Sequence, residues 1–364
     1  VEWSRIQPTP DRWDEDALDR YRQMLRGLLE RGMTPLVTLH HFTDPLWLTE
    51  QGGWENPATP TLFKNYVCRV VEALKEYTHT WITINEPNVY TSSGYFIGNF
   101  PPGKSDLNLA FTTMINMVRG HAAAYREIHR IQREAQVGMA VNYRSFYPAR
   151  TWLPMDRWAA GIKNVLFNDF FPVAAWNGRL NFLYKRSRLP EAAHTQDFLG
   201  VNYYTRDLVA FAPFDGAELF GHHSFPANAD LSDQGFINNV PEGMFEALKW
   251  GRKFGVPMMV TENGVECQDD HIRPRYLAQH LHQVWRAVNF NWPVKGYFHW
   301  SLVDNFEWER GWTQRFGLWE MDPETQVRRK RPSVDLYAAI CKENGISSEM
   351  IARYAPEVSP VLFP

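Results

Sequence analysis

Two glutamates close two apolar stretches of the chain, and as a pair they are suited to acid–base and nucleophilic chemistry. Glu86 lies in the segment TINEP, and Glu262 lies in the segment VTENG, 176 positions further along (262 − 86). A pair of carboxyl groups can cleave a glycosidic bond, because one protonates the leaving oxygen while the other attacks the sugar or activates water. Either glutamate alone is more typical of a turn, since Pro87 and Asn263 follow them directly. Taken together, they make glycoside cleavage the working hypothesis.

The elements that must position this pair alternate between apolar strands and amphipathic helices. The expected strands are residues 35–42, 80–87, 136–143, 197–204, 256–264 and 294–301, with residues 1–6 as the tail of a further strand. The expected helices are residues 16–32, 59–77, 108–134, 155–176, 241–255, 273–290 and 332–345. This unbroken alternation predicts a parallel sheet with helices outside it, and no linker or repeat divides the chain.

Each expected strand ends in polar or aromatic residues, and this pattern favours one kind of parallel sheet. The strand ends are His40–His41, Asn85–Glu86, Asn142–Tyr143, Asn202–Tyr204, Glu262–Asn263 and His299–Trp300. In a barrel of eight strands, functional groups gather at the C-terminal ends of the strands. An open doubly wound sheet concentrates them near one switch point instead. We therefore expect an α/β fold, the (β/α)8 TIM barrel, as a single catalytic domain over residues 1–364.

Four longer segments accompany the two glutamate motifs. They are LHHFTDPLWL, GGWENP, DFLGVNYY and GYFHWSLVDNFEWERGWTQRFGLWEMD. All six segments resemble motifs of glycoside hydrolase family 1, the β-glucosidase group, and they occur in the family's order from about residue 2 to about residue 345. The resemblance implies a (β/α)8 barrel that hydrolyses terminal β-D-glycosides with retention of configuration. In that mechanism a covalent glycosyl-enzyme intermediate forms and is then hydrolysed.

The resemblance also implies roles for individual residues, the first of which are Glu86 as general acid/base and Glu262 as nucleophile. The other implied site residues are Asn85 on the sugar 2-hydroxyl, His41 on the 3-hydroxyl, Tyr204 on the nucleophile, Trp300 under the sugar ring, and Glu307 with Trp308 at the far end of the glycone. Asn202 lies two residues before Tyr204, so on a strand it shares that face, and we expect it among the substrate-binding residues. The chemistry requires the acid to stay protonated near neutral pH while the nucleophile stays ionised.

Two positions depart from the family pattern. The family has a strand before the first residue of this sequence, with a glutamine that binds the sugar. It then has an arginine in the strand that leads into VEWSR. This sequence begins after both, and Arg5 matches a different arginine. The resemblance therefore implies a barrel that lacks its first strand and part of its second in the chain as given, with a higher pKa at the nucleophile. Phe42 stands where the family usually has tryptophan, which removes an indole N–H donor.

The stretch GNFPPGKS, residues 98–105, matches the phosphate-binding loop pattern, but its surroundings argue against that function. A phosphate-binding loop follows an apolar strand directly and offers backbone N–H groups to the phosphates. The residues before it are VYTSSGYFI, and Pro101 and Pro102 inside it have no N–H to donate. We expect a turn-rich loop here and no nucleotide-hydrolase activity.

Composition limits the partners and the compartment. The chain has 38 basic and 41 acidic side chains, and a formal net charge of −3 argues against a nucleic acid or an anionic membrane as partner. Three scattered cysteines suggest neither a zinc site nor a disulfide framework, so a reducing cytoplasm is expected. His40 and His41 point to opposite faces of a strand, His121 is expected to be structural, and the basic run at residues 327–333 is read as a solvated turn. We expect no metal and no required cofactor.

The expected substrates are β-glucosides, with β-galactosides, β-fucosides or cello-oligosaccharides as further candidates. Glu307 bears on this choice, because a carboxylate there suits neutral sugar hydroxyls and would repel a 6-phosphate. The competing interpretation is a sugar-binding barrel with little or no turnover, which follows from the segment that the sequence does not contain.

Overall fold

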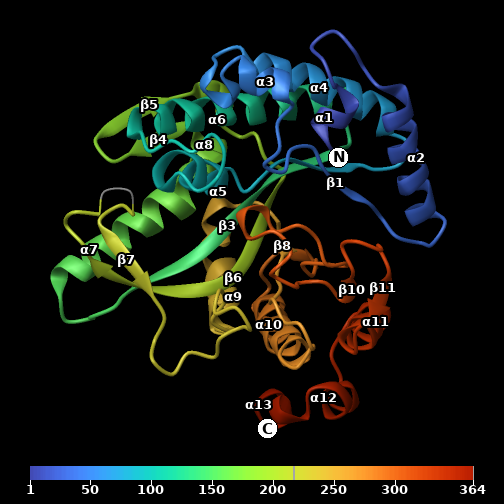
Figure 1. The fold of residues 1–364 in the computed structure, drawn as a ribbon, viewed down its shortest axis with the longest axis vertical. Helices are drawn as coiled ribbons and strands as arrows, with labels where there is room; N and C mark the ends of the chain where they lie inside the picture. Colours follow the sequence, from blue (N-terminus) through green and yellow to red (C-terminus); the bar gives the residue numbers. More distant parts are fainter. Residues whose placement is uncertain (216–217, 364) are drawn as a thin grey trace. The chain divides into compact units, whose positions relative to one another are not determined.

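The structure is a computed structural model that describes residues 1–215 and 218–363. The chain forms two compact units, which are Val1–Asn142 with Val165–Gly200, and Tyr143–Asn164 with Val201–Pro364. Strands β3 (Gln136–Pro148) and β6 (Phe198–Phe211) belong to both units, so each unit contains part of both strands. Figure 1 shows the elements in chain order.

The first unit combines parallel strands with long helices. Its other elements are α1 (Trp3–Ile6), α2 (Glu15–Leu29), β1 (Leu36–Thr38), α3 (Leu46–Glu50), α4 (Thr59–Leu74), β2 (Thr80–Asn85), α5 (Pro87–Ser92), α6 (Leu107–Ile131), α8 (Phe170–Asn177), β4 (Arg179–Phe182) and β5 (Lys185–Arg188). Strand β2 pairs in parallel with β1 on one side and with β3 on the other. Helices α4 and α6 pack together in this unit (Figure 1), and β2 is almost completely buried. The predicted strand–helix alternation is confirmed for this part of the chain.

The expectation of a strand over residues 1–6 is wrong, because Trp3–Ile6 forms the short helix α1. The Gln7 N–H donates to the Trp3 carbonyl at 2.8 Å, which closes a helical turn. Trp3 and Ile6 are spaced three residues apart and are both buried, as one helical face requires. The Trp3 ring stacks on Tyr66 of α4 with 4.8 Å between ring centroids, so tertiary packing determines the local structure here.

The stretch that matches the phosphate-binding pattern is a loop, as expected. It follows α5 and a π-helical turn at Ser93–Ile97, and no strand precedes it directly. The Lys104 ammonium donates to both Glu55 carboxylate oxygens, at 2.6 and 2.8 Å. Phe100 packs edge-on against Phe42 with centroids 5.8 Å apart. The lysine that a phosphate site would need is therefore engaged by a carboxylate.

The second unit contains the remaining strands and helices. They are α7 (Pro154–Lys163), β7 (Gly221–Ser224), α9 (Glu242–Gly251), β8 (Met258–Glu262), α10 (Arg273–Asn289), β9 (Val294–Tyr297), β10 (Trp319–Met321), β11 (Arg328–Lys330), α11 (Ser333–Glu343), α12 (Ser348–Tyr354) and α13 (Ser359–Leu362). The hydrogen-bonded strand order is β1-β2-β3-β6-β8-β9, with β7 antiparallel on β6 and β9 parallel to β8. The antiparallel pair β10–β11 was not expected from the sequence.

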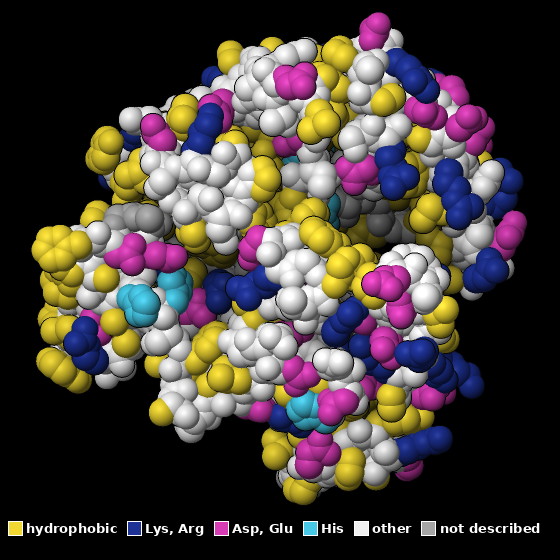
Figure 2. Space-filling view, in the orientation of Figure 1, with side chains coloured by type: hydrophobic (Ala, Val, Ile, Leu, Met, Phe, Trp, Pro, Cys, Tyr) yellow, Lys and Arg dark blue, Asp and Glu magenta, His cyan; other side chains and the backbone are white. Residues whose placement is uncertain are grey.

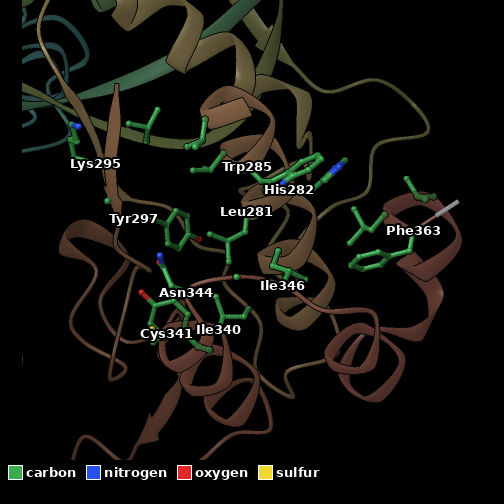
Figure 3. Close-up of a pocket in the computed structure, with 18 residues that line it drawn as sticks. Leu281, His282, Trp285, Lys295, Tyr297, Ile340, Cys341, Asn344, Ile346 and Phe363 are labelled. Atoms are coloured by element: carbon green, nitrogen blue, oxygen red, sulfur yellow. The ribbon is translucent and has the colours of Figure 1, made fainter. Parts of the chain in front are cut away.

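An apolar cavity of about 940 Å³ lies within this unit, lined by side chains of α10, β9, α11 and the chain's C-terminal end (Figure 3). Leu281 and Ile340 are among its apolar lining residues, and Trp285 is 57% exposed beside it. No carboxylate is among the lining residues of this cavity. It is therefore not the place where a carboxyl pair would act.

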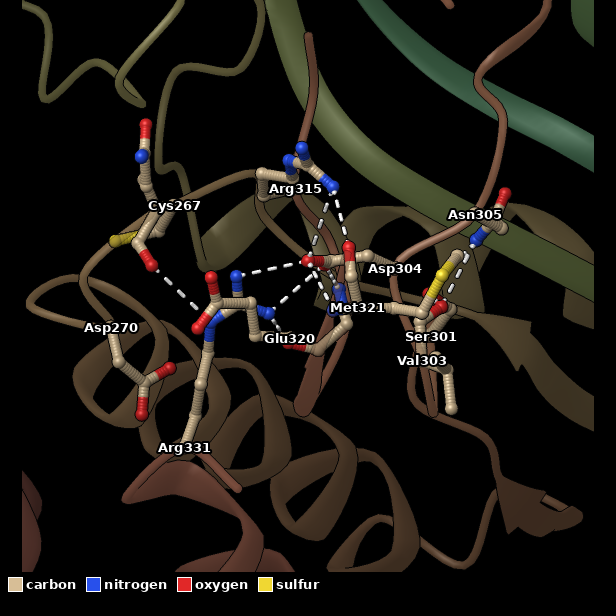
Figure 4. A network of polar contacts seen from close by, with 12 residues as sticks. Cys267, Asp270, Ser301, Val303, Asp304, Asn305, Arg315, Glu320, Met321 and Arg331 are labelled. Carbon is tan, nitrogen blue, oxygen red and sulfur yellow. Dashed lines mark hydrogen bonds and ion pairs between the residues drawn. The ribbon is translucent and has the colours of Figure 1, made fainter. Parts of the chain in front are cut away.

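A buried ion pair holds the segment between β9 and α11 in place (Figure 4). The Arg331 guanidinium donates to both oxygens of Asp304, at 2.9 and 3.0 Å, and also to the Gly317 carbonyl. The Gly317 N–H donates back to Asp304 at 2.8 Å. The basic run at residues 327–333 is solvated over Arg328–Lys330, but these residues form the strand β11 and not a turn, and Arg331 turns inward and is 5% exposed.

On the face shown in Figure 2, basic and acidic side chains are interspersed, as the small net charge predicts. No helix in the part of the chain that the structure describes combines the length and the apolar character needed to span a membrane.

We predict that Asp304→Asn lowers the free energy of unfolding by about 3–5 kcal/mol, because it leaves the buried Arg331 charge without its partner. Urea titration followed by tryptophan fluorescence measures the change. The matched control is Asp335→Asn, which removes a carboxylate from an exposed pair with Lys330. That control should change stability by less than about 1 kcal/mol. Equal unfolding free energies for the two variants would contradict the prediction.

Candidate active site

Glu86 occupies a strained position at the junction between β2 and α5. Its backbone adopts the left-handed conformation, with φ 45° and ψ 53°, which is uncommon for a residue with a Cβ. The Glu86 N–H donates to the Ala140 carbonyl of β3 at 2.8 Å, so the strand pairing itself fixes this conformation. The side chain is 6% exposed. Strained backbone of this kind clusters at functional sites, where surrounding structure over-determines it.

Asn142 of β3 holds the Glu86 side chain. Its amide nitrogen donates to Glu86 Oε1 at 2.9 Å. Asn142 is in turn tied to Asn88, which donates to its carbonyl at 2.8 Å and accepts from its N–H at 3.3 Å. The sequence placed Asn142 at a strand end but gave it no role in the site. Asn142 could have been recognised from the sequence, because it is a polar residue at the end of an apolar strand, as the candidate site residues are.

Asn85 and His41 lie side by side in the first unit. The Asn85 amide nitrogen lies 3.3 Å from His41 Nε2, and the Asn85 N–H donates to the His40 carbonyl at 2.8 Å. Burial of the His41 ring, together with the neighbouring His40, lowers the pKa of His41 to about 3. His41 is therefore neutral at ordinary pH and can accept or donate a hydrogen bond without carrying a charge.

The other two histidines singled out in the sequence are structural. His40 is 2% exposed, and its Nε2 lies 3.1 Å from the Asp44 carboxylate, which also accepts from Tyr90 and Trp54. His121 is fully buried in α6, with its Nδ1 2.6 Å from the Thr83 hydroxyl. Both rings therefore serve the packing of the first unit.

In the second unit, Glu262 closes β8 and is held by Tyr204 of β6. The Tyr204 hydroxyl donates to Glu262 Oε2 at 2.6 Å, a short bond of the kind expected when the acceptor is charged. Asn202 is completely buried, and its side-chain oxygen accepts from the hydroxyl of Thr261, the residue before the glutamate. Both residues therefore fix the end of β8: Asn202 holds Thr261, and Tyr204 holds Glu262.

Asn263 anchors the segment that follows Glu262. Its amide nitrogen donates to the Tyr203 carbonyl at 2.6 Å and to the Tyr276 hydroxyl at 3.0 Å, and its oxygen accepts from Tyr297 at 2.8 Å. Tyr276 in turn donates to the Tyr204 carbonyl at 2.9 Å. Burial raises the pKa values of Tyr276 and Tyr297 well above the ordinary value for tyrosine. Both hydroxyls therefore stay protonated and can donate hydrogen bonds. The sequence gave these two tyrosines no role.

Trp300 and Glu307 are also brought together within the second unit. Trp300 Nε1 donates to Glu307 Oε1 at 3.3 Å, and the Trp300 N–H donates to the Asn263 carbonyl at 2.9 Å. Trp308 follows at the start of a short 3-10 helix, with φ 47°. A Cβ on Gly264 would lie 1.8 Å from the Trp300 carbonyl oxygen, so only glycine permits this approach to the end of β8.

Each unit therefore presents one glutamate at a strand end, held by a neutral donor. Glu86, held by Asn142, directly follows Asn85, which lies beside His41, and Glu262 is held by Tyr204. A carboxyl group held in this way can act as an acid, a base or a nucleophile, and neither amide nor phenol competes with it for a proton near neutral pH. Among the described residues, the side chains grouped closely enough to share a metal ion are Asp233, Cys267, Asp269 and His271, which include none of these site residues.

The chain is similar to known proteins of one family. A sequence model of Glycosyl hydrolase family 1 matches residues 1–346. The chain is 30% identical to a β-galactosidase of Pyrococcus woesei, over 96% of this chain and 83% of that protein. It superposes on the structure of a β-glycosidase from Pyrococcus horikoshii with a TM-score of 0.91 and 36% identity, covering 97% of this chain and 82% of the other. A β-glucosidase from Thermotoga maritima, in complex with deoxynojirimycin, gives a TM-score of 0.89 at 31% identity, covering 95% and 83%.

We predict that Gly264→Ala destabilises the protein by about 3 kcal/mol or more, because its methyl group collides with backbone that cannot move independently. Gly296→Ala on β9 is the matched control, since a Cβ there meets only Phe298, at 3.9 Å. Thermal unfolding of both variants by circular dichroism tests the prediction. Equal melting temperatures for the two variants would show that the approach of Trp300 to Gly264 is not a constraint.

Proposed function

The chain belongs to glycosyl hydrolase family 1 and is a retaining β-glycosidase with the family's (β/α)8 fold, and we propose that Glu86 and Glu262 carry out its reaction. Glu86 is assigned as the general acid/base and Glu262 as the nucleophile. The observation that carries the proposal is that both glutamates close strands and that each is held by a neutral hydrogen-bond donor, Asn142 and Tyr204 respectively.

The proposed reaction proceeds in two displacements. The Glu262 carboxylate attacks the anomeric carbon and forms a glycosyl ester, while the bond to the aglycone oxygen breaks and Glu86 gives that oxygen its proton. Water then attacks the anomeric carbon, Glu86 takes the water's proton, and the ester bond to Glu262 breaks. Two inversions give net retention. The chemistry requires the two carboxyl groups about 5–5.5 Å apart in the active enzyme.

Neighbouring residues support each carboxyl group in the proposal. Tyr204 orients the Glu262 oxygen and stabilises its negative charge, which keeps the nucleophile ionised. Asn85 is placed to bond the sugar 2-hydroxyl, a contact that strengthens in the transition state of this reaction class. His41, neutral and beside Asn85, is assigned to the 3-hydroxyl. Asn202 contributes by holding Thr261, and through it the end of β8.

The glycone is assigned to Trp300, Glu307 and Trp308. The Trp300 ring offers a flat apolar face to a pyranose, and its bond to Glu307 fixes the orientation of both side chains. A carboxylate at Glu307 favours neutral hydroxyls over a 6-phosphate. We propose β-glucosides as the main substrates, with β-galactosides, β-fucosides and cello-oligosaccharides as further substrates. A β-galactosidase and a β-glucosidase among the similar proteins support the β-glucosides and β-galactosides in this range.

Further parts of the proposal concern the whole chain. Residues 1–364 act as one catalytic domain to which both units contribute, and the two-displacement chemistry requires no cofactor. Cys68, Cys267 and Cys341 all carry free thiols, which supports a reducing, cytoplasmic location. The alternative of a sugar-binding barrel without turnover is not favoured, because the family's sequence model matches residues 1–346 and both glutamates are present.

We predict that the purified protein releases β-glucose first from an aryl β-glucoside, as followed by proton NMR before the anomers equilibrate. Glu262→Ala should lower the rate by about 10⁴-fold or more, because no intermediate can form. Glu86→Ala should slow an alkyl β-glucoside far more than a dinitrophenyl β-glucoside, whose leaving group needs no proton. Glu343→Ala, on the exposed end of α11, is the matched control.

Three outcomes would oppose this assignment. Early release of α-glucose would contradict retention. A Glu262→Ala variant as active as Glu343→Ala would remove Glu262 from the mechanism. Equal losses on both aryl and alkyl substrates for Glu86→Ala would show that Glu86 does not act as the proton donor.

We also predict that Tyr204→Phe lowers kcat by about 10- to 100-fold, because the nucleophile loses a charge-assisted hydrogen bond. The same substitution should shift the acidic limb of the pH profile of kcat/KM upward, since the ionised form of Glu262 is less stabilised. Tyr184→Phe, at an exposed tyrosine, is the control. An unchanged pH profile for Tyr204→Phe would refute the role given to its hydroxyl.

A further inference from the structure

We propose that Asp233, Cys267, Asp269 and His271 form a binding site for one Zn²⁺ ion on the surface of the second unit. Three of these residues follow the end of β8, and Asp233 comes from the loop between β7 and α9. One ligand-type atom from each residue lies within 4.8 Å of the others. The proposal is independent of the catalytic assignment, since none of the four side chains belongs to it.

The distances within the cluster fit a tetrahedral ion. Cys267 Sγ lies 3.5 Å from Asp269 Oδ1 and 3.4 Å from His271 Nδ1. Zinc bonds of about 2.3 Å to sulfur and about 2.0–2.1 Å to nitrogen or oxygen place tetrahedral ligand atoms roughly 3.3–3.6 Å apart. His271 Nδ1 and Asp269 also form a direct hydrogen bond, which the ion replaces when these two exposed side chains rotate apart. Asp233 is measured against the other ring nitrogen, with its Oδ1 3.8 Å from His271 Nε2, and its place in the cluster rests on the 4.8 Å limit that the four ligand atoms share.

The chemistry of the donors selects the metal. A thiolate, an imidazole and carboxylates are the ligands that Zn²⁺ takes, whereas Mg²⁺ and Ca²⁺ take oxygen ligands. Cys267 is 1% exposed while the other three residues are exposed, so the cluster is closed on the core side and open to an entering ion. Burial raises the pKa of the Cys267 thiol, so the ion displaces a proton when it binds the sulfur.

The backbone around the cluster is already fixed by other bonds. The Gln268 N–H donates to Asp233 Oδ2 at 2.6 Å, which ties the two segments together beside the proposed ion. The Cys267 carbonyl accepts from Arg273 at 2.7 Å, and its N–H donates to the Arg315 carbonyl at 2.9 Å. Little backbone order has to be created on binding, and preorganised ligands of this kind raise affinity.

The site has a structural connection to the proposed catalytic residues. Cys267 belongs to a buried cluster with Tyr276 and Phe316, against which Tyr204 and Trp300 pack. An ion bound to Cys267 would therefore restrain the layer behind the tyrosine that holds Glu262. We expect Zn²⁺ to act by stabilising this layer, since Glu262 itself is not a ligand.

The test uses the untagged, full-length chain, stripped of metal with EDTA and titrated with Co²⁺ as a spectroscopic substitute for Zn²⁺. We expect one equivalent of Co²⁺ to produce a thiolate charge-transfer band, with visible bands typical of tetrahedral cobalt, and Zn²⁺ to displace it. Cys267→Ser should abolish the charge-transfer band. The matched control is Cys341→Ser, at an exposed cysteine on α11, which should leave the band unchanged.

A second measurement separates binding from folding. His271→Ala changes a side chain that is 55% exposed, so the variant should fold, and its Zn²⁺ affinity should fall by at least about 100-fold. Zn²⁺ should raise the melting temperature of the parent protein and not that of His271→Ala. The proposal is overturned if the parent protein shows no charge-transfer band, if Cys267→Ser keeps it, or if His271→Ala binds Zn²⁺ with unchanged affinity.

Discussion

Holding two carboxyl groups at the ends of apolar strands, one of them buried, is the constraint on which the rest of this structure depends. A buried charge is costly unless hydrogen-bond donors replace the water that it loses. Glu86 is 6% exposed and accepts from Asn142, and Glu262 accepts from Tyr204. Both donors are neutral, so they orient the carboxyl groups without adding a counter-charge. A fixed cation beside Glu86 would oppose the protonated form that its proposed role requires.

Holding Glu262 in place also requires the residues behind it to be fixed. Tyr204 can hold Glu262 only if its own backbone is fixed, and the Tyr276 hydroxyl fixes it by donating to the Tyr204 carbonyl. Tyr276 is oriented in turn by Asn263, the residue after the nucleophile. These hydrogen bonds connect Tyr204, Tyr276 and Asn263, so several elements together determine the position of Glu262. Precision of this kind is what a reaction between fixed groups needs.

The sequence predicted the strands, and a glutamate at the end of two of them, because these signals are local. Polar residues at the ends of apolar runs are visible in the sequence alone, and all six expected strands are present. The predicted strand over residues 1–6 was wrong, because Trp3 packs on Tyr66 and this segment is helical instead of extended. The sequence also assigned no role to Asn142 or Tyr276, whose partners lie 56 and 72 positions away. Such pairings depend on which strands and helices are neighbours, and spacing along the chain does not encode that.

The segment after β8 shows why polar side chains concentrate behind Glu262. Between Glu262 and α10 the backbone is irregular and largely buried, so regular strand or helix pairing does not satisfy all of its hydrogen bonds. Arg273 donates to the Cys267 carbonyl, and Arg331 donates to the Gln268 carbonyl at 3.2 Å. Each arginine is itself neutralised, by Asp270 and Asp304 respectively. The two buried ion pairs therefore accompany the irregular chain that leaves β8, because this chain satisfies its hydrogen bonds partly with side chains instead of regular structure.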